Sequence, residues 1–122
     1  MGRPEEGIEL NVLAIRSDPL NPSIFFRHTG LALGYYLSGD DSSCVAWATK
    51  SIQRNPAWYL GHVYLLAGLG LLGRHEEAAA VLHDYLARYP AASIGELDRL
   101  PLKRAGDAER LRAGLRAAGL PD

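Results

Sequence analysis

The stretch FFRHTGLALGYYLSGDDSSCVAWATKSIQRNPAW at residues 25–58 is followed directly by YLGHVYLLAGLGLLGRHEEAAAVLHDYLARYPAA at residues 59–92. The two stretches are equal in length, and they align without a gap. At least eight positions are identical, whereas average composition gives about two by chance. The identical pairs include His28 and His62, Leu31 and Leu65, Gly34 and Gly68, Leu37 and Leu71, Gly39 and Gly73, Ala46 and Ala80, Arg54 and Arg88, and Pro56 and Pro90. A repeat of this period predicts a helical array.

Each copy contains two helical patterns, which are separated by a glycine turn and closed by a proline. Gly39 and Gly73 end the first helices, because glycine adopts positive φ without a steric penalty. The proline residues Pro56 and Pro90 close the second helices. The sequence therefore predicts a pair of antiparallel helices in each copy.

This unit resembles the tetratricopeptide repeat (TPR), the helix–turn–helix repeat whose period it shares. The first-helix positions where that family carries an aromatic residue, Leu-Gly and Tyr hold His28, Leu31-Ala32 and Tyr35, and then His62, Leu65-Leu66 and Leu69. The small, large and small positions of the second helix hold Cys44, Ala48 and Ser51, and then Ala78, Leu82 and Tyr85. The two histidines and the large Tyr85 depart from the family pattern.

The resemblance implies an all-α fold, a right-handed α-solenoid of two full repeats with flanking partial helices. We expect one domain over residues 1–122. Its expected parts are a half-repeat helix over 6–19, repeats over 25–58 and 59–92, and capping helices over 93–122.

Local signals predict the helix boundaries. We expect a helix from Glu6 to Ser17, because the residue before Pro19 avoids helical geometry. Asn21 is expected to cap a helix that runs to Ser38, and Asp41 to Arg54 forms the next. Further helices are expected up to Leu72, from Glu76 to Arg88, and from Asp107 to Ala118. Ser93 and Glu96 predict a short helix that Pro101 stops, and Gly106 is expected to break the chain.

Composition excludes several classes of protein. The net charge is −1, with 13 basic and 14 acidic residues, so the chain lacks the basic excess of a nucleic-acid surface. We expect no signal peptide, because the first residues lack the basic, apolar and small-residue pattern. The sequence has no apolar run long enough to span a membrane. We expect a bacterial, cytoplasmic protein. Cys44, at a small buried position of the repeat, is expected to pack in the core.

The run Gly68-Leu69-Gly70-Leu71-Leu72-Gly73 matches the G-x-G-x-x-G pattern of dinucleotide-binding turns. Two glycines of the run, however, have partners at the repeat offset, and no acidic residue follows near residues 91–93. We therefore expect close helix packing at Gly68 and Gly70 and a helix end at Gly73, with nucleotide binding as a remote alternative.

Other candidate chemistry is weaker. His28 and His62 occupy equivalent positions and could begin a metal site, but no third ligand follows at a fixed spacing. We expect them to replace aromatic residues in the packing. Ser42 and Ser43 are interpreted as first-turn helix residues. The prediction is a non-enzymatic chain with no catalytic residues, no metal and no cofactor.

The TPR resemblance places the binding surface on the first helices, which line a concave groove. The implied groove residues are Phe26, Thr29, Leu33, Tyr36, Leu37, Leu60, Val63, Ala67, Gly70 and Leu71. An apolar groove of this kind needs a cover. The chain's own terminal helices, a partner's helix or a second copy could provide that cover.

A narrower resemblance rests on DPLNPSIFF, LGLLGRHEEAAAVL and ERLRAGLRAAGLPD. These stretches are similar to the C-terminal TPR region of bacterial adenylate/guanylate cyclase-like regulatory proteins. The expected function is a non-catalytic protein–protein interaction module, regulatory or assembly-related, that binds a protein or peptide through the groove. The alternative is homodimerisation with a structural role.

Overall fold

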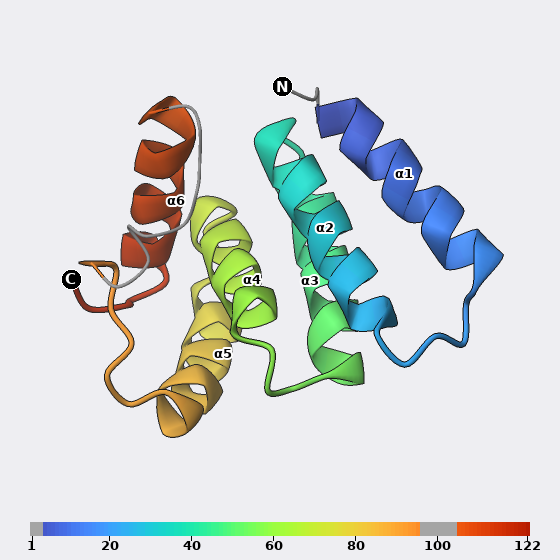
Figure 1. Cartoon of the computed structure of the whole chain (residues 1–122). Coiled ribbons are helices and arrows are strands. Elements are labelled where there is room, and N and C mark those ends of the chain that lie inside the picture. Colours follow the sequence, from blue (N-terminus) through green and yellow to red (C-terminus); the bar gives the residue numbers. More distant parts are fainter. Residues whose placement is uncertain (1–3, 96–104) are drawn as a thin grey trace. The chain divides into compact units, whose positions relative to one another are not determined.

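The computed structural model describes residues 4–95 and 105–122, and every regular element in these ranges is helical (Figure 1). The α-helices are α1 (Pro4–Ser17), α2 (Ile24–Leu37), α3 (Asp41–Arg54), α4 (Tyr59–Leu71), α5 (His75–Arg88) and α6 (Ala105–Ala117). This confirms the predicted all-α class. Glu96 and Pro101, on which the predicted short helix depends, lie outside the described residues.

The chain divides into two compact units, Met1–Leu65 and Leu66–Asp122. Unit 1 therefore holds α1, α2, α3 and the first half of α4, whereas unit 2 holds the second half of α4 with α5 and α6. The division falls inside α4 and not at residue 58, where the first sequence repeat ends.

In unit 1, α2 packs against both α1 and α3 (Figure 1). Its contact with α1 is close because two glycines face that helix. An added Cβ at Gly30 would lie 2.7 Å from Asn11 Nδ2, and one at Gly34 would lie 2.7 Å from Ile8 Cγ1. On the α3 side, Thr29 Oγ1 lies 2.6 Å from Ser51 Oγ in a buried hydrogen bond. Small residues thus bring the three helices together.

The backbone hydrogen bonds repeat at the same offset as the sequence. At the end of α2, the amides of Ser38, Gly39 and Asp40 donate to the carbonyls of Gly34, Tyr36 and Tyr35. At the end of α4, the amides of Leu72, Gly73 and Arg74 donate to the carbonyls of Gly68, Gly70 and Leu69. The turn glycines have φ of 87° at Gly39 and 72° at Gly73. The predicted glycine stops are therefore confirmed.

The start of α2 differs from the prediction. The helix begins at Ile24 with Ser23 at the N-cap, because the Asn21 side chain folds the chain before the helix begins. Asn21 Oδ1 accepts a hydrogen bond of 2.8 Å from the Ser23 amide. The same turn recurs before α4, where Asn55 Oδ1 accepts a hydrogen bond of 3.1 Å from the Ala57 amide. In both places the asparagine side chain stabilises the turn that precedes the helix, and it does not cap the helix.

In unit 2, α6 lies directly on the second half of α4. An added Cβ at Gly114 would lie 2.5 Å from the carbonyl oxygen of Ala67, so the two backbones meet with no side chain between them. Leu111 and Leu115 of α6 are buried. The prediction that Gly106 breaks the chain is wrong: Gly106 lies inside α6, where a Cβ would meet nothing within 4 Å.

Candidate partner-binding surface

Half of the residues implied for the groove are not on the surface. Phe26 is exposed, and Leu33, Leu37, Leu60 and Leu71 are half-buried. The buried ones are Thr29, Tyr36, Val63, Ala67 and Gly70. The implied groove is corrected at these five positions, which belong to the packed interior and cannot contact a partner in this structure.

Packing inside each unit explains several of these buried positions. Thr29 is buried because its hydroxyl faces Ser51 of α3 and also donates a hydrogen bond of 2.9 Å to the Phe25 carbonyl. Ala67 and Gly70 are buried under α6, where the Gly114 backbone lies against both. All residues from 61 to 70 of α4 are buried, as expected for a helix that is apolar on every side. The chain's own helix α6 thus covers the Ala67 and Gly70 positions.

The glycine run at residues 68–73 forms no nucleotide-binding turn. A dinucleotide site needs a strand before the first glycine and a helix after the last. Here residues 62–67 are helical, and Gly68 and Gly70 lie within the same helix, α4. The close packing expected at Gly70 is confirmed by its contact with Gly114, and Gly73 ends the turn after α4.

The two equivalent histidines have separate structural contacts. His28 is 8 % exposed, and its ring lies 5.5 Å from the Trp47 ring. His62 is 3 % exposed, and its Nε2 lies 2.8 Å from the Pro56 carbonyl oxygen. Both are therefore part of the helix packing. In the described part of the chain, no three His, Cys, Asp or Glu side chains form a cluster that could hold a metal ion.

Burial and charge change two pKa values in unit 1. Burial lowers the pKa of His28 below 6.5, and the positive charges of Lys50 and Arg54 lower it further, against the opposing effect of a hydrogen bond with the Lys50 backbone. Burial raises the pKa of Tyr64 to about 12, with smaller contributions from Cys44 and Tyr59. The Cys44 thiol is buried as expected, and it donates to the Tyr64 carbonyl oxygen at 3.6 Å. These groups belong to the interior and offer no exposed nucleophile.

An aromatic cluster lies at the start of α2 and α4. We define it as Phe25, Phe26, Trp58 and Tyr59. The Trp58 ring centroid lies 5.9 Å from Phe25, 5.6 Å from Phe26 and 5.5 Å from Tyr59. Phe26 is 57 % exposed and Tyr59 is 36 % exposed. Sequence reasoning found only Phe26. The signal for the others is the recurrence of two adjacent aromatic residues at 25–26 and 58–59.

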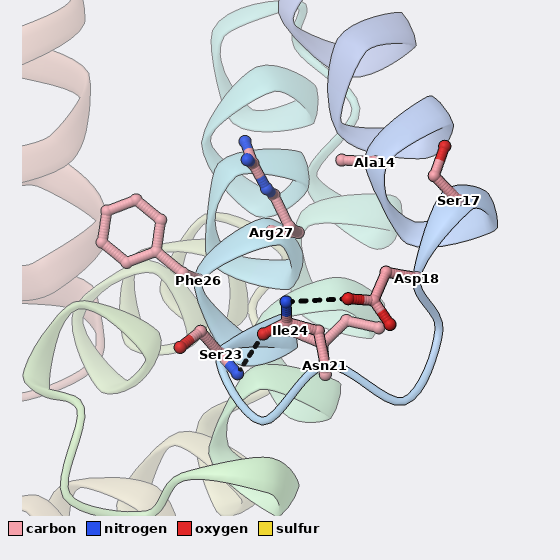
Figure 2. Close-up of a pocket in the computed structure, with 8 residues that line it drawn as sticks. All are labelled: Ala14, Ser17, Asp18, Asn21, Ser23, Ile24, Phe26 and Arg27. Atoms are coloured by element: carbon pink, nitrogen blue, oxygen red, sulfur yellow. Dashed lines mark hydrogen bonds between the residues drawn. The ribbon is translucent and has the colours of Figure 1, made fainter.

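A pocket of about 420 Å³ lies beside Phe26, between the end of α1 and the start of α2. Figure 2 shows Phe26 projecting from α2 away from α1, and Asp18 and Asn21 facing one another in the loop. Asn21 Nδ2 donates a hydrogen bond of 3.0 Å to Asp18 Oδ2. These polar groups therefore hold the loop together. The adjoining Phe26 ring is apolar and exposed.

The sequence pattern of α2 and α4, which are the first helices of the two repeats, recurs in α6. Leu111, Gly114 and Gly119 have the same spacing as Leu31, Gly34 and Gly39 and as Leu65, Gly68 and Gly73. The same three hydrogen bonds end α6, from the amides of Ala118, Gly119 and Leu120 to the carbonyls of Gly114, Arg116 and Leu115. The φ of Gly119 is 98°. The interval from Gly73 to Gly119 is longer than the interval from Gly39 to Gly73, so a search at the repeat period misses this third copy.

Comparison with known proteins adds no relative. No family model matches the chain, and neither curated proteins nor solved structures include a significant match. Among the described helices, none is long and apolar enough to cross a bilayer. Function is therefore argued from the surface itself.

Proposed function

We propose that the chain is a non-catalytic protein-interaction module built from TPR-like helix pairs in a right-handed solenoid. The repeat of both sequence and backbone hydrogen bonds at one common period supports this family. In such modules the helix pairs form a scaffold, and exposed side chains on it bind the partner.

The observation that carries the binding proposal is the aromatic cluster, in which Phe26 and Tyr59 are exposed. Large aromatic rings supply much contact area at a low cost in conformational entropy, and they dominate the energetics of interfaces. Phe26 also lies on the same face of α2 as the half-buried Leu33 and Leu37, which follow it two and three helical turns later. We propose that a protein segment with apolar side chains binds along this face.

The cluster can be tested with peptides selected on the protein from a random display library. We expect Phe26→Ser to weaken binding of the selected peptides at least tenfold, whereas Phe26→Tyr preserves it. Leu72→Ser is the matched control, because Leu72 is an exposed apolar residue, 38 % accessible, outside the cluster. Quenching of Trp58 fluorescence would report binding directly. Peptides that bind equally well without the Phe26 ring would refute the assignment of this surface.

The resemblance to cyclase-like regulatory proteins leads to a narrower proposal, in which the module regulates or assembles a larger system. Its partner would then be a second protein of that system. Self-association through the remaining exposed groove residues is the alternative, and it predicts that Phe26→Ser changes the oligomeric mass of the free protein.

A further inference from the structure

The outer face of α1 is apolar and uncovered. In this respect α1 differs from α3 and α5, the second helices of the two repeats. Leu10 is 66 % exposed and Leu13 is 58 % exposed. None of the residues of α1 is buried. The helix therefore contacts α2 with one side and leaves two leucines on the other side in water.

The internal repeat shows what kind of element belongs on this face. The chain after α1 has the same hydrogen bonds as the chain after α3. Asp18 and Asn21 donate to the carbonyls of Ala14 and Asp18, as Asn55 and Trp58 donate to those of Ser51 and Asn55. When Asp18 is aligned with Asn55 in this way, Leu10 and Leu13 correspond to Trp47 and Lys50.

Trp47 lies on the side of α3 that faces its partner helix α2, and the exposed Lys50 lies beside it at the edge of that side. The Trp47 ring lies against His28 of α2, and Lys50 Nζ lies 4.7 Å from the centroid of the Trp47 ring. The two helices of such a pair run antiparallel because a short turn joins them. By the same logic, Leu10 lies where an antiparallel helix would pack, and Leu13 lies at the edge of that place. No described helix of unit 1 occupies it.

The charges on α1 identify the helix that fits. Glu5, Glu9 and Arg16 share one flank of the leucine stripe, because they are separated by one and then two helical turns. In the described part of the chain, no basic group forms an ion pair with either glutamate, and no acidic group forms one with Arg16. The acidic residues lie in the first half of the helix and the basic residue lies in the last turn.

The charge pattern of α1 is complementary to that of a second α1 that runs in the opposite direction. When two α1 helices pack antiparallel, Leu10 of each faces Leu13 of the other. Arg16 of each then lies between Glu5 and Glu9 of the other. We propose that α1 is the interface of a symmetric homodimer, in which two copies of α1 pair antiparallel through Leu10 and Leu13. The symmetric contact closes on itself and needs no further copy.

The helix α6, at the other end of the chain, does not offer a second apolar face for association. In α2 the face toward the second helix carries His28 and Thr29, which are buried. The equivalent positions of α6 are Ala108 and Glu109, and Glu109 is exposed and paired with Arg112 at 2.9 Å. At Glu109 this face of α6 is charged and suited to water, so α1 is the helix whose apolar face needs a cover.

Sedimentation equilibrium over a wide range of concentrations tests the proposal. The contact involves one helix of 14 residues from each copy, so we expect a small interface and reversible, concentration-dependent dimers. Leu13→Glu and Arg16→Glu should each raise the dissociation constant at least tenfold. The matched control is Arg88→Glu, because Arg88 is also an exposed arginine in the last turn of its helix. It should leave the dimer unchanged.

A charge swap makes the test specific. The double variant Glu5→Arg/Glu9→Arg should also fail to dimerise, because it brings arginines against Arg16 of the second copy. Mixing it with Arg16→Glu should restore a dimer that contains one copy of each variant. Circular dichroism checks that every variant keeps its helices.

Three results would overturn the proposal: a monomer at all concentrations, a dimer that ignores both the leucine and the charge variants, or a mass that rises without limit. The peptide-binding test at Phe26 is separate, since it uses no residue of α1. The dimer can therefore fail while the proposed function stands, and the reverse also holds.

Discussion

The two compact units attach their flanking helices in different ways. In unit 1, glycines of α2 face side chains of α1, and α1 buries none of its own residues. In unit 2, α6 contacts α4 through glycines that face backbone, and it buries Leu111 and Leu115. The comparison teaches that a close helix contact does not by itself stabilise a helix. Stability comes from the apolar side chains that are buried around that contact.

The largest expected difference concerns the leucines. Leu115→Ala should lower the free energy of unfolding by about 3 kcal/mol, because the side chain is fully buried and its removal leaves a cavity. Leu13→Ala should change it by less than about 0.5 kcal/mol, because Leu13 is exposed in the monomer. Urea denaturation followed by circular dichroism measures both, at concentrations where any dimer has dissociated. Equal losses would mean that α1 is attached as firmly as α6.

The glycines provide a sharper test of the two contacts. Gly114→Ala should destabilise unit 2 by about 2 kcal/mol, because the new Cβ would meet the carbonyl of Ala67, and backbone cannot give way. Gly34→Ala should destabilise unit 1 by less, about 1 kcal/mol. Its Cβ would meet Cγ1 of the Ile8 side chain and not backbone, and the helix propensity of alanine, about 1 kcal/mol better than that of glycine, offsets part of the cost of the shift. Amide hydrogen exchange in α6 and α1 separates the two effects, and a protected α6 in Gly114→Ala would contradict this account.

The smallest expected effect is a response of unit 1 to acid. Because the pKa of folded His28 is below its ordinary value of 6.5, the unfolded chain binds a proton more readily than the folded chain. The contribution of neutral His28 to the free energy of unfolding is therefore complete above pH 6.5. It declines as the pH falls below 6.5 toward the lowered pKa. Unfolding at stepwise lower pH should show this slope in the wild type and lose it in His28→Gln. His83→Gln, at an exposed position of α5, is the control and should keep the slope.

The sequence was a good guide where local chemistry decides the structure. Gly39 and Gly73 end helices at positive φ as predicted, because few other residues adopt that conformation. The helix from Asp41 to Arg54 has the predicted bounds, since Asp40 caps it by accepting a hydrogen bond from the Ser43 amide. Each of these signals lies within a few residues of the feature it determines.

The sequence was a poor guide to the features that packing between distant residues determines. Whether Thr29 faces a partner or α3 depends on Ser51, which lies on the next helix. The cover over Ala67 and Gly70 comes from α6, whose likeness to the first helices does not follow the repeat period. A groove assigned from a family pattern assumes that such a cover is absent. The aromatic cluster was missed because its rings come from two helix starts that are distant in the sequence.

The side chains that can report unfolding, tryptophan and cysteine, are confined to one of the two units. Both tryptophans, Trp47 and Trp58, and the cysteine Cys44 belong to unit 1, and unit 2 contains none of either kind. Indole fluorescence and the rate of thiol labelling therefore record the opening of unit 1 alone. Backbone circular dichroism records both units together. Recording these signals in the same experiment gives the order in which the two units unfold, without any added label.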